Sequence, residues 1–230
     1  EQTVVDERWV APKPESLSFE QAAAVPLVAI TAWEALFDHG HLTEGEWTLI
    51  HAGAGGVGHV AVQLAADAGA RVLTTVGSAD KAELARAFGA HRPLLYKETD
   101  FADAALETTG ATGVDLALDT VGPATLEATF PAVRFYGRTV TLLDPKGISL
   151  KKARLRNQSI ALELMLSPLF FGLDAARAHQ TAILEQCARL IDAGRLRIHL
   201  QRSFPLEEAA EAHRLVESGA MTGKAVLTVA

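Results

Sequence analysis

Apolar and polar positions alternate along the chain with two different periods. From residue 47 to residue 164, short apolar runs are separated by segments in which apolar residues recur every three or four positions. The runs predict buried parallel strands, and the segments between them predict amphipathic helices that cross over with a right-handed turn. The predicted strands are Trp47–His51, Arg71–Val76, Pro93–Tyr96, Val114–Asp119, Gly137–Leu143 and Ser159–Leu164. The predicted helices are Gly56–Ala68, Asp80–Phe88, Ala102–Thr108 and Ala124–Val133. This series predicts an α/β protein with a Rossmann-type, doubly wound sheet of six parallel strands.

The two ends of the chain show other patterns. Thr3–Val10 is typical of a short extended stretch, and Ser18 is placed to cap an Ala-rich helix that ends near Pro26. A second helix is predicted from Leu27 to Asp38, before Gly40. Towards the other end, the pattern predicts two amphipathic helices and a last strand, over Asp174–Ala193, Leu206–Gly219 and Ala225–Val229.

Composition narrows the class of protein. Of the 230 residues, 49% are hydrophobic and 21% are charged, so the chain can fill a core and is not a low-complexity sequence. A net charge of −7 argues against a nucleic-acid partner or an anionic membrane surface. The longest apolar run, Ala22–Ile30, contains Pro26 and is shorter than the roughly 18 residues of a membrane span. Because Cys187 is the single cysteine and no signal-peptide pattern is present, we expect a cytoplasmic protein.

A glycine-rich loop carries the strongest chemical signal. Gly53, Gly55 and Gly58 form G-x-G-x-x-G between the first predicted strand and the helix after it. There the first glycine permits a tight turn, the second lets the backbone approach a pyrophosphate, and the third allows close helix–strand packing. A tight turn without a ligand is the alternative, whereas a kinase loop is excluded because no V-A-I-K, H-R-D or D-F-G sequence follows. His51 and His59 flank the loop, where either a phosphate contact or a purely structural role is possible.

The end of the second predicted strand indicates which dinucleotide binds. NAD sites usually place Asp or Glu there, but this strand continues as Gly77 and Ser78 and has no acid before Asp80. A carboxylate would repel a 2′-phosphate, whereas a hydroxyl, a backbone amide and the charge of Lys81 would accept one. The sequence therefore favours NADP(H), although Lys81 can also be read as a solvated lysine at a helix start.

Taken in order, the motifs resemble those of the medium-chain dehydrogenase/reductase superfamily, in its zinc-independent quinone oxidoreductase branch. The resemblance extends over nearly the whole chain. The matching stretches are Ala22–Pro26, Thr31–Trp33, Ala52–Gly58, Gly77–Lys81, Phe88–Ala90, Tyr96, Asp100–Phe101, Asp119–Gly122, Gly137–Arg138, Phe204–His213 and Gly223–Lys224.

The resemblance implies a set of cofactor contacts and an activity. The residues expected around the pyrophosphate are Gly53, Gly55, Gly56, Val57 and Gly58; those around the 2′-phosphate are Gly77, Ser78, Lys81 and Tyr96; and those around the nicotinamide and its ribose are Thr31, Asp119, Leu142 and Leu143. The implied reaction is hydride transfer from NADPH to a quinone or an α,β-unsaturated carbonyl compound. A homodimer through Ser159–Leu164 is also implied. No side chain stands out as a general acid, so no catalytic residue is predicted.

The resemblance also sets expectations about metal. In zinc-dependent relatives a cysteine ligand lies four residues before the threonine that matches Thr31, and Leu27 occupies that position here. His39 and His41 form the remaining candidate pair, without cysteine or carboxylate support nearby in the sequence. We therefore expect no metal.

Domain organisation follows from the same resemblance. Such reductases carry an N-terminal GroES-like catalytic domain of roughly a hundred residues. We expect residues 1–25 to be the tail of that domain, 26–170 to be the Rossmann domain, and 171–230 to be helices and a strand that return towards the catalytic domain. Remnants of it would then lie at both ends, and the last strand would have lost its partners. A truncated or partial reductase is favoured, with a natural stand-alone cofactor module as the alternative.

Other classes of protein fit less well. A short-chain dehydrogenase needs Tyr-x-x-x-Lys, but Tyr96 and Tyr136 are followed at that spacing by Asp100 and Val140. A methyltransferase would normally place an acid at the end of the second strand. The serious alternative is a non-enzymatic NADP(H)-binding module that acts as a sensor or scaffold.

Overall fold

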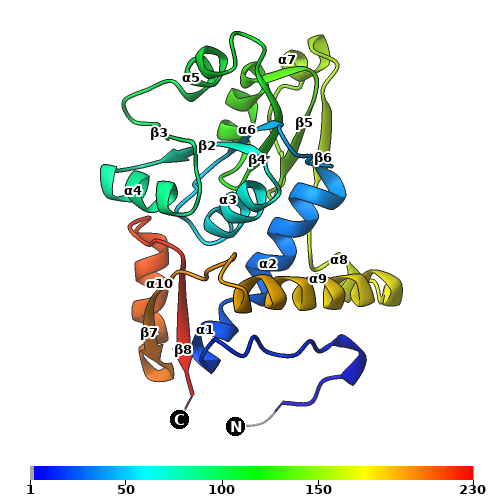
Figure 1. Ribbon diagram of the computed structural model, residues 1–230, viewed down its shortest axis with the longest axis vertical. Coiled ribbons are helices and arrows are strands. Elements are labelled where there is room, and N and C mark those ends of the chain that lie inside the picture. Colours follow the sequence, from blue (N-terminus) through cyan, green and yellow to red (C-terminus); the bar gives the residue numbers. More distant parts are fainter. Residues whose placement is uncertain (1–2, 230) are drawn as a thin grey trace.

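Six parallel strands form the central sheet of the computed structural model, which describes residues 3–229. The strands are β1 (Trp47–Ile50), β2 (Arg71–Val76), β3 (Arg92–Leu95), β4 (Val114–Asp119), β5 (Val133–Thr141) and β6 (Ser159–Leu162). Their order is β3-β2-β1-β4-β5-β6 and every neighbouring pair is parallel (Figure 1). The chain starts at the centre, winds to one edge, returns and winds to the other. This is the doubly wound Rossmann order, and it confirms the predicted fold class.

Helices cover both faces of the sheet because side chains of each strand point alternately to opposite sides. Leu49 of β1 packs with Leu73 of β2 on one face, whereas Ile50 and Val72 belong to the core on the other. The crossover helices before β3 share the core of Ile50; they are α3 (Gly58–Asp67) and α4 (Ala79–Ala87). The later ones are α5 (Phe101–Thr108), α6 (Pro123–Thr129), η3 (Phe130–Ala132) and α7 (Lys151–Leu155).

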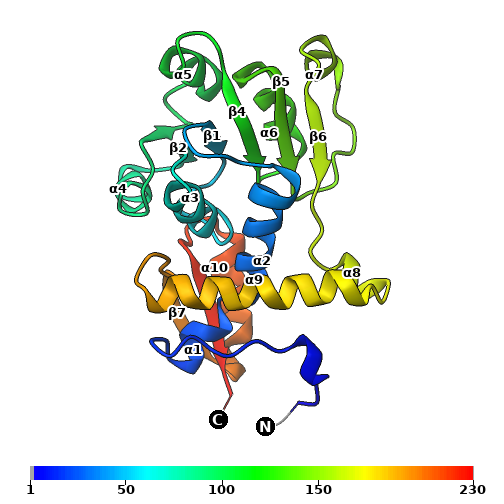
Figure 2. The ribbon, with the colours of Figure 1, turned by 45° about the vertical axis from the view of Figure 1, so that its right-hand side comes forward.

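A second layer lies below the carboxyl ends of the strands (Figure 1). Its long helix α9 (Asp174–Asp192) buries Ile183, Cys187 and Leu190 in the main core and runs across the molecule beneath β4, β5 and β6 (Figure 2). The first helices are α1 (Phe19–Ala23), α2 (Pro26–Trp33) and the π-helix η2 (Glu34–His39). The remaining elements are η1 (Glu7–Trp9), α8 (Ser167–Phe170), β7 (Leu200–Pro205), η4 (Leu206–Glu208), α10 (Ala209–Glu217) and β8 (Lys224–Thr228).

Two expectations about the chain ends are wrong. The last strand was expected to have lost its partners, but β8 pairs in parallel with β7. The sequence did not predict β7 because its positions are mostly polar and only Phe204 is fully buried. Thr3–Val10 is not simply extended, because the Asp6 carboxylate accepts a hydrogen bond from the Arg8 N–H at 3.0 Å and starts the short helix η1.

Other differences concern where elements end. The helix predicted from Leu27 begins at Pro26 and changes to a π-helix after Trp33. β5 starts at Val133, which was assigned to the preceding helix, and stops at Thr141 rather than Leu143. The capping box of α1 is present, since the Ser18 hydroxyl accepts a hydrogen bond from the Gln21 N–H at 3.2 Å.

Candidate functional site: a groove along the glycine-rich loop

The loop between β1 and α3 lies where the strand order reverses, and its backbone is closely packed. A Cβ atom on Gly53 would lie 2.0 Å from Thr74 Oγ1, and one on Gly58 would lie 2.1 Å from the carbonyl oxygen of Ala52. Neither position can therefore hold a larger residue without a backbone shift. No side chain caps the N-terminus of α3 in the described part of the chain. The N–H groups of His59 and Val60 donate to the carbonyl oxygens of Gly55 and Val57, whereas those of Val57 and Gly58, at the very start of the helix, are left for water or for an anionic ligand.

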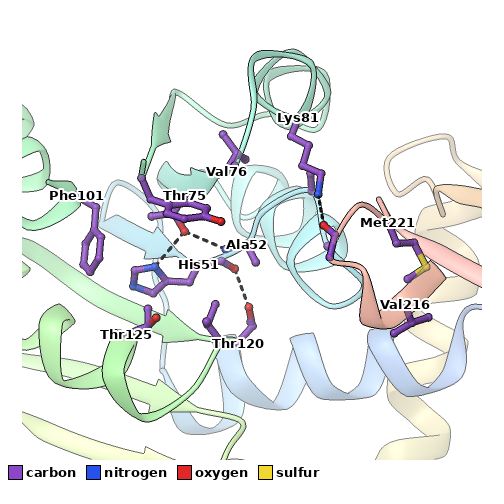
Figure 3. A pocket seen from close by; sticks show the side chains of 16 residues that line it. His51, Ala52, Thr75, Val76, Lys81, Phe101, Thr120, Thr125, Val216 and Met221 are labelled. Carbon is purple, nitrogen blue, oxygen red and sulfur yellow. Dashed lines mark hydrogen bonds between the residues drawn. The ribbon is translucent and has the colours of Figure 1, made fainter. Parts of the chain in front are cut away.

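A hollow of about 720 Å³ lies on one side of this loop. Its lining includes Gly77 and Tyr96, which follow β2 and β3. It also includes Val216 and Met221 of the C-terminal segment, which lie on the side away from His51 and Phe101 (Figure 3). Lys81 reaches from α4 across the rim, where its Nζ donates a hydrogen bond to the carbonyl oxygen of Gly219 at 2.8 Å. The described residues that line this hollow include no acid, so Lys81 gives it a positive character.

A second hollow of about 370 Å³ lies on the other side of the loop. Its walls include Thr31 of α2 and the apolar Leu142 and Leu143 that follow β5. The two hollows share Ala52, Gly55 and Thr120, so they form one groove that passes along the glycine-rich loop. A polar, positively charged end and a largely apolar end suit a ligand with a charged half and a planar half.

Most of the predicted contact residues line this groove. Those at the larger hollow are Gly55, Gly77, Lys81 and Tyr96, and those at the smaller one are Thr31, Gly55, Gly56, Val57, Gly58, Leu142 and Leu143. Gly53, Ser78 and Asp119 line neither hollow. They shape the backbone around the groove, as a tight turn, a helix cap and an anchor of a loop. Ser78 caps α4, where its hydroxyl accepts a hydrogen bond from the Lys81 N–H at 3.4 Å.

Asp119 holds the loop that follows β4. It is fully buried, and its Oδ1 accepts hydrogen bonds from the N–H groups of Val121 and Gly122, both at 3.1 Å. Its Oδ2 accepts a hydrogen bond from the Thr141 hydroxyl at 2.8 Å. The carboxylate thus fixes the loop that forms the floor shared by both hollows.

His51 is a structural residue at the larger hollow. Its Nε2 lies 2.8 Å from Thr129 Oγ1, whose proton is already donated to the Thr125 carbonyl, so His51 Nε2 is the donor in this pair. Its Nδ1 then accepts a hydrogen bond from the Thr75 hydroxyl, which lies 3.1 Å away (Figure 3). Burial lowers the pKa of His51 to about 3, which keeps the imidazole neutral.

His59 links the glycine-rich loop to the C-terminal layer. Its Nδ1 donates to the carbonyl oxygen of Gly55 at 2.9 Å, and its Nε2 accepts a hydrogen bond from the His199 N–H at 3.2 Å. Burial lowers the pKa of His59 to about 4, and the hydrogen bond to Gly55 only partly offsets this. Both histidines beside the loop therefore have the structural role that the sequence left open.

Glu163 is a residue at the smaller hollow that sequence reasoning missed. It follows β6 and is only 5% exposed, and its Oε2 lies 3.0 Å from Nε2 of His39. Burial raises the pKa of Glu163 to about 8, and the Glu34 and Asp38 carboxylates add to that rise. The available signal was an acid within the apolar stretch 160–166, but only the folded chain brings three acidic side chains together.

Among residues 3–229, no group of three or more His, Cys, Asp or Glu side chains is arranged so that it could hold a metal ion, and this includes the acidic cluster around Glu163. Leu27 lines the smaller hollow at the position where zinc-dependent relatives have a cysteine. Of the candidate pair, the His39 side chain contacts Glu163, and His41 follows η2 with a positive φ of 48°. Within residues 3–229, no helix is both long enough and apolar enough to cross a membrane.

Comparisons with known proteins agree with this geometry. A family model described as "Zinc-binding dehydrogenase" matches residues 88–227. The chain is 32% identical to Highly-reducing polyketide synthase 1 of Aureobasidium melanogenum over 226 residues, which is 95% of this chain and 10% of that protein. It is 30% identical to the 2-haloacrylate reductase of a Burkholderia species, covering 94% of this chain and 65% of the reductase.

A solved structure of Escherichia coli quinone oxidoreductase complexed with NADPH superposes with a TM-score of 0.86 at 30% identity, over 95% of this chain and 68% of that one. The chain therefore spans about two thirds of the length of these single reductases and a tenth of the length of the polyketide synthase. With the parallel six-stranded sheet and the family match over more than half of its residues, the chain belongs to the zinc-binding dehydrogenase family of the medium-chain dehydrogenase/reductase superfamily.

Proposed function

We propose that this chain binds NADP(H) and serves a reductase that transfers hydride to an electron-poor double bond. The observation that carries the proposal is the continuous groove on both sides of the glycine-rich loop, with Lys81 at its polar end and no acid lining that end. Gly55–Gly58 and the N-terminus of α3 would hold the pyrophosphate. Gly77, Lys81 and Tyr96 would surround the 2′-phosphate. The N–H groups of the turn at Ser78, which follows Gly77 in the chain, would lie beside it.

The nicotinamide, when bound, supplies a hydride; the chain's own residues supply position and shelter. Thr31, Leu142 and Leu143 would lie against the ring in the smaller hollow. The Thr31 hydroxyl already donates to the Leu27 carbonyl at 2.7 Å, so it is held in one orientation and offers only its lone pairs to a ligand. A bound ring that covers the apolar Leu142 and Leu143 would displace water from them, which would strengthen polar interactions inside the hollow.

The names of the relatives indicate which kind of compound accepts the hydride. The Burkholderia protein is a reductase of 2-haloacrylate, an α,β-unsaturated acid, and the Escherichia coli protein is a quinone oxidoreductase. We therefore propose an α,β-unsaturated carbonyl compound or a quinone. The polyketide synthase relatives favour a second candidate, in which the same reduction acts on an unsaturated thioester within a larger synthase.

Zinc has no part in this proposal, although the family description names it. Among the described residues, no group of three or more His, Cys, Asp or Glu side chains is arranged so that it could hold a metal ion, and Leu27 lies where a cysteine would be needed. We assign no step to a metal.

We also propose that two copies of the chain associate through the β6 edge. No neighbouring strand covers that edge among the described residues, and Leu162 and Leu164 are 60% and 55% exposed. An open apolar edge is a favourable place for strand pairing.

Replacement of Lys81 tests the cofactor assignment. Lys81→Ala removes a charge that NADPH would contact through its 2′-phosphate and that NADH would not contact, so the Kd for NADPH should rise about tenfold or more while the Kd for NADH changes far less. NADH is an internal control, because loosening the Gly219 contact would affect both cofactors alike. Lys152→Ala, an exposed lysine on α7, should change neither Kd. Equal losses for both cofactors would contradict the assignment, and NADPH binding without turnover of any enone or quinone would favour the sensor or scaffold.

A further inference from the structure

Glu163 brings a buried carboxyl group to the hollow proposed for the nicotinamide and the acceptor. Its N–H donates to the Thr141 carbonyl at 3.0 Å, which places it beside the carboxyl end of β5 and next to Leu142. Its side chain is only 3% exposed. Its Oε1 is buried and receives no hydrogen bond from any side chain or backbone group of the described residues. An ionised carboxylate would be poorly satisfied in such a place.

The groups around Glu163 favour a bound proton. Glu34 and Asp38 of η2 face it with like charge, the Glu34 carboxylate is also a hydrogen-bond partner that favours the protonated form of Glu163, and His39 of the same element contacts Glu163 Oε2. From α9, His179 lies 2.8 Å from Asp38, and Gln180 donates to Glu34 at 3.1 Å. Asp38 and Glu34 thus each have a hydrogen-bond partner on α9. Glu163 is the buried one of the three carboxyl groups, and its Oε1 has no hydrogen-bond donor among the described residues. Desolvation, repulsion by the Glu34 and Asp38 carboxylates and the hydrogen bond to Glu34 together raise the pKa of Glu163, and a protonated carboxyl group suits the buried Oε1, which lacks a donor.

His39 connects this carboxyl group to solvent. Its side chain is 41% exposed, and its Nε2 is 3.0 Å from Glu163 Oε2. An imidazole that contacts water on one side and a buried acid on the other can pass protons between them. Water, His39 and Glu163 therefore form a short chain that ends at the smaller hollow.

We propose that Glu163 is the proton donor of the reaction and that His39 returns the proton from water. The inference rests on the proposed function, in which NADPH supplies a hydride and is oxidised. Addition of that hydride to the β-carbon of an α,β-unsaturated carbonyl compound leaves an enolate. The O–H bond of Glu163 then breaks as a C–H bond forms at the α-carbon, and the carboxylate regains a proton through the His39 imidazole.

This assignment narrows the acceptor class. A quinone yields a hydroquinone anion whose oxygen atoms take protons from water, so it needs no acid from the protein. An enolate needs a proton at carbon, where a positioned acid accelerates the step. The buried acid therefore favours α,β-unsaturated carbonyl acceptors over quinones.

The proton on Glu163 is measurable without cofactor or turnover. The infrared carbonyl band of a protonated carboxyl group should be present in the full chain at pH 7, be lost in Glu163→Gln, and disappear on titration through about pH 8. Glu185→Gln, at an exposed position on α9, should leave the band unchanged. Absence of the band in the wild type would overturn the inference whatever the activity shows.

Kinetics separate this inference from the proposed function. Glu163→Gln keeps the shape of the side chain and should lower kcat for an enone about a hundredfold or more, with the Kd for NADPH unchanged, and should lower kcat for a quinone far less. Glu34→Gln removes a repelling carboxylate and should move the alkaline fall of the wild-type enone rate to lower pH. A fully active Glu163→Gln with the wild-type pH profile would overturn the inference and leave the proposed function intact. A wild type that oxidises NADPH with neither acceptor would overturn both.

Discussion

Acidification from pH 7 to pH 5 should weaken the fold through His51 by a calculable amount. The pKa of His51 is lowered by burial from 6.5 to about 3. A group with a depressed pKa in the folded state contributes stability above its unfolded pKa and loses it as the pH falls. At pH 5 the unfolded imidazole is 1.5 units below its pKa and protonated, whereas the folded one is still neutral. At about 1.4 kcal/mol per unit, the free energy of unfolding falls by about 2 kcal/mol.

Comparison with His51→Gln isolates this contribution. Other groups also respond over the same range: His59, with a pKa lowered to about 4, adds to the loss, and Glu163, with a pKa raised to about 8, opposes it. These effects are common to wild type and variant, so they cancel in the difference between the two. Urea unfolding at pH 7 should show the variant to be less stable, because an amide cannot match both threonine contacts of the imidazole.

At pH 5 the difference in the free energy of unfolding between wild type and His51→Gln (the gap) should be about 2 kcal/mol smaller than at pH 7. The exposed His213 on α10 provides a matched control, and the gap for His213→Gln should be the same at both pH values. If the gap for His51→Gln also stays constant, the protonated imidazole is accommodated without penalty. The reasoning from burial and from the two threonine partners would then be refuted.

Two further predictions concern the glycine-rich loop and the β6 edge. Gly58→Ala places a Cβ atom 2.1 Å from the Ala52 carbonyl oxygen and should lower the free energy of unfolding by about 3 kcal/mol or more. In Gly56→Ala the new Cβ atom meets only atoms at 3.6 Å, so this variant should stay within about 1 kcal/mol of wild type. Thermal unfolding of both variants tests the difference. Leu162→Arg introduces like charges across the proposed paired edges and should yield a monomer in light scattering, while the single chain unfolds as in wild type. If the measured mass does not change, the contact lies elsewhere or the wild type is itself monomeric.

Much of the sheet could be predicted from the sequence because its strands carry their own signal. A buried parallel strand is apolar on both faces, so Leu49 and Ile50 mark β1 without any knowledge of their neighbours. The glycine-rich loop is equally local, since the turn, the close approach to Thr74 and the start of α3 all fall within a few residues. Strand ends carry a weaker signal in the sequence: β5 begins at Val133, where an apolar helix and an apolar strand have the same composition.

The rest of the site depends on contacts between distant parts of the chain. The distinctive chemistry of Glu163 comes from Glu34 and Asp38, which lie more than a hundred residues away in the sequence. β7 was missed for a related reason, because a mostly polar strand is stabilised by its pairing with β8 and by the burial of Phe204. Sequence patterns record what each segment buries, not which charged groups the fold brings together.

The C-terminal layer holds the cofactor groove in shape at three points. His199 donates to His59, which in turn holds the Gly55 carbonyl; the Gly223 N–H donates to the Ala54 carbonyl at 2.8 Å; and Lys81 reaches the Gly219 carbonyl. Residues 54–59 are thus bonded on one side to their own strand and helix, and on the other to residues 199 and 223, far later in the chain. A glycine-rich turn alone would leave the phosphate cradle free to move relative to its outer wall. Because the second layer fixes both, the groove is set by packing between layers, and the motif predicts its location but not its shape.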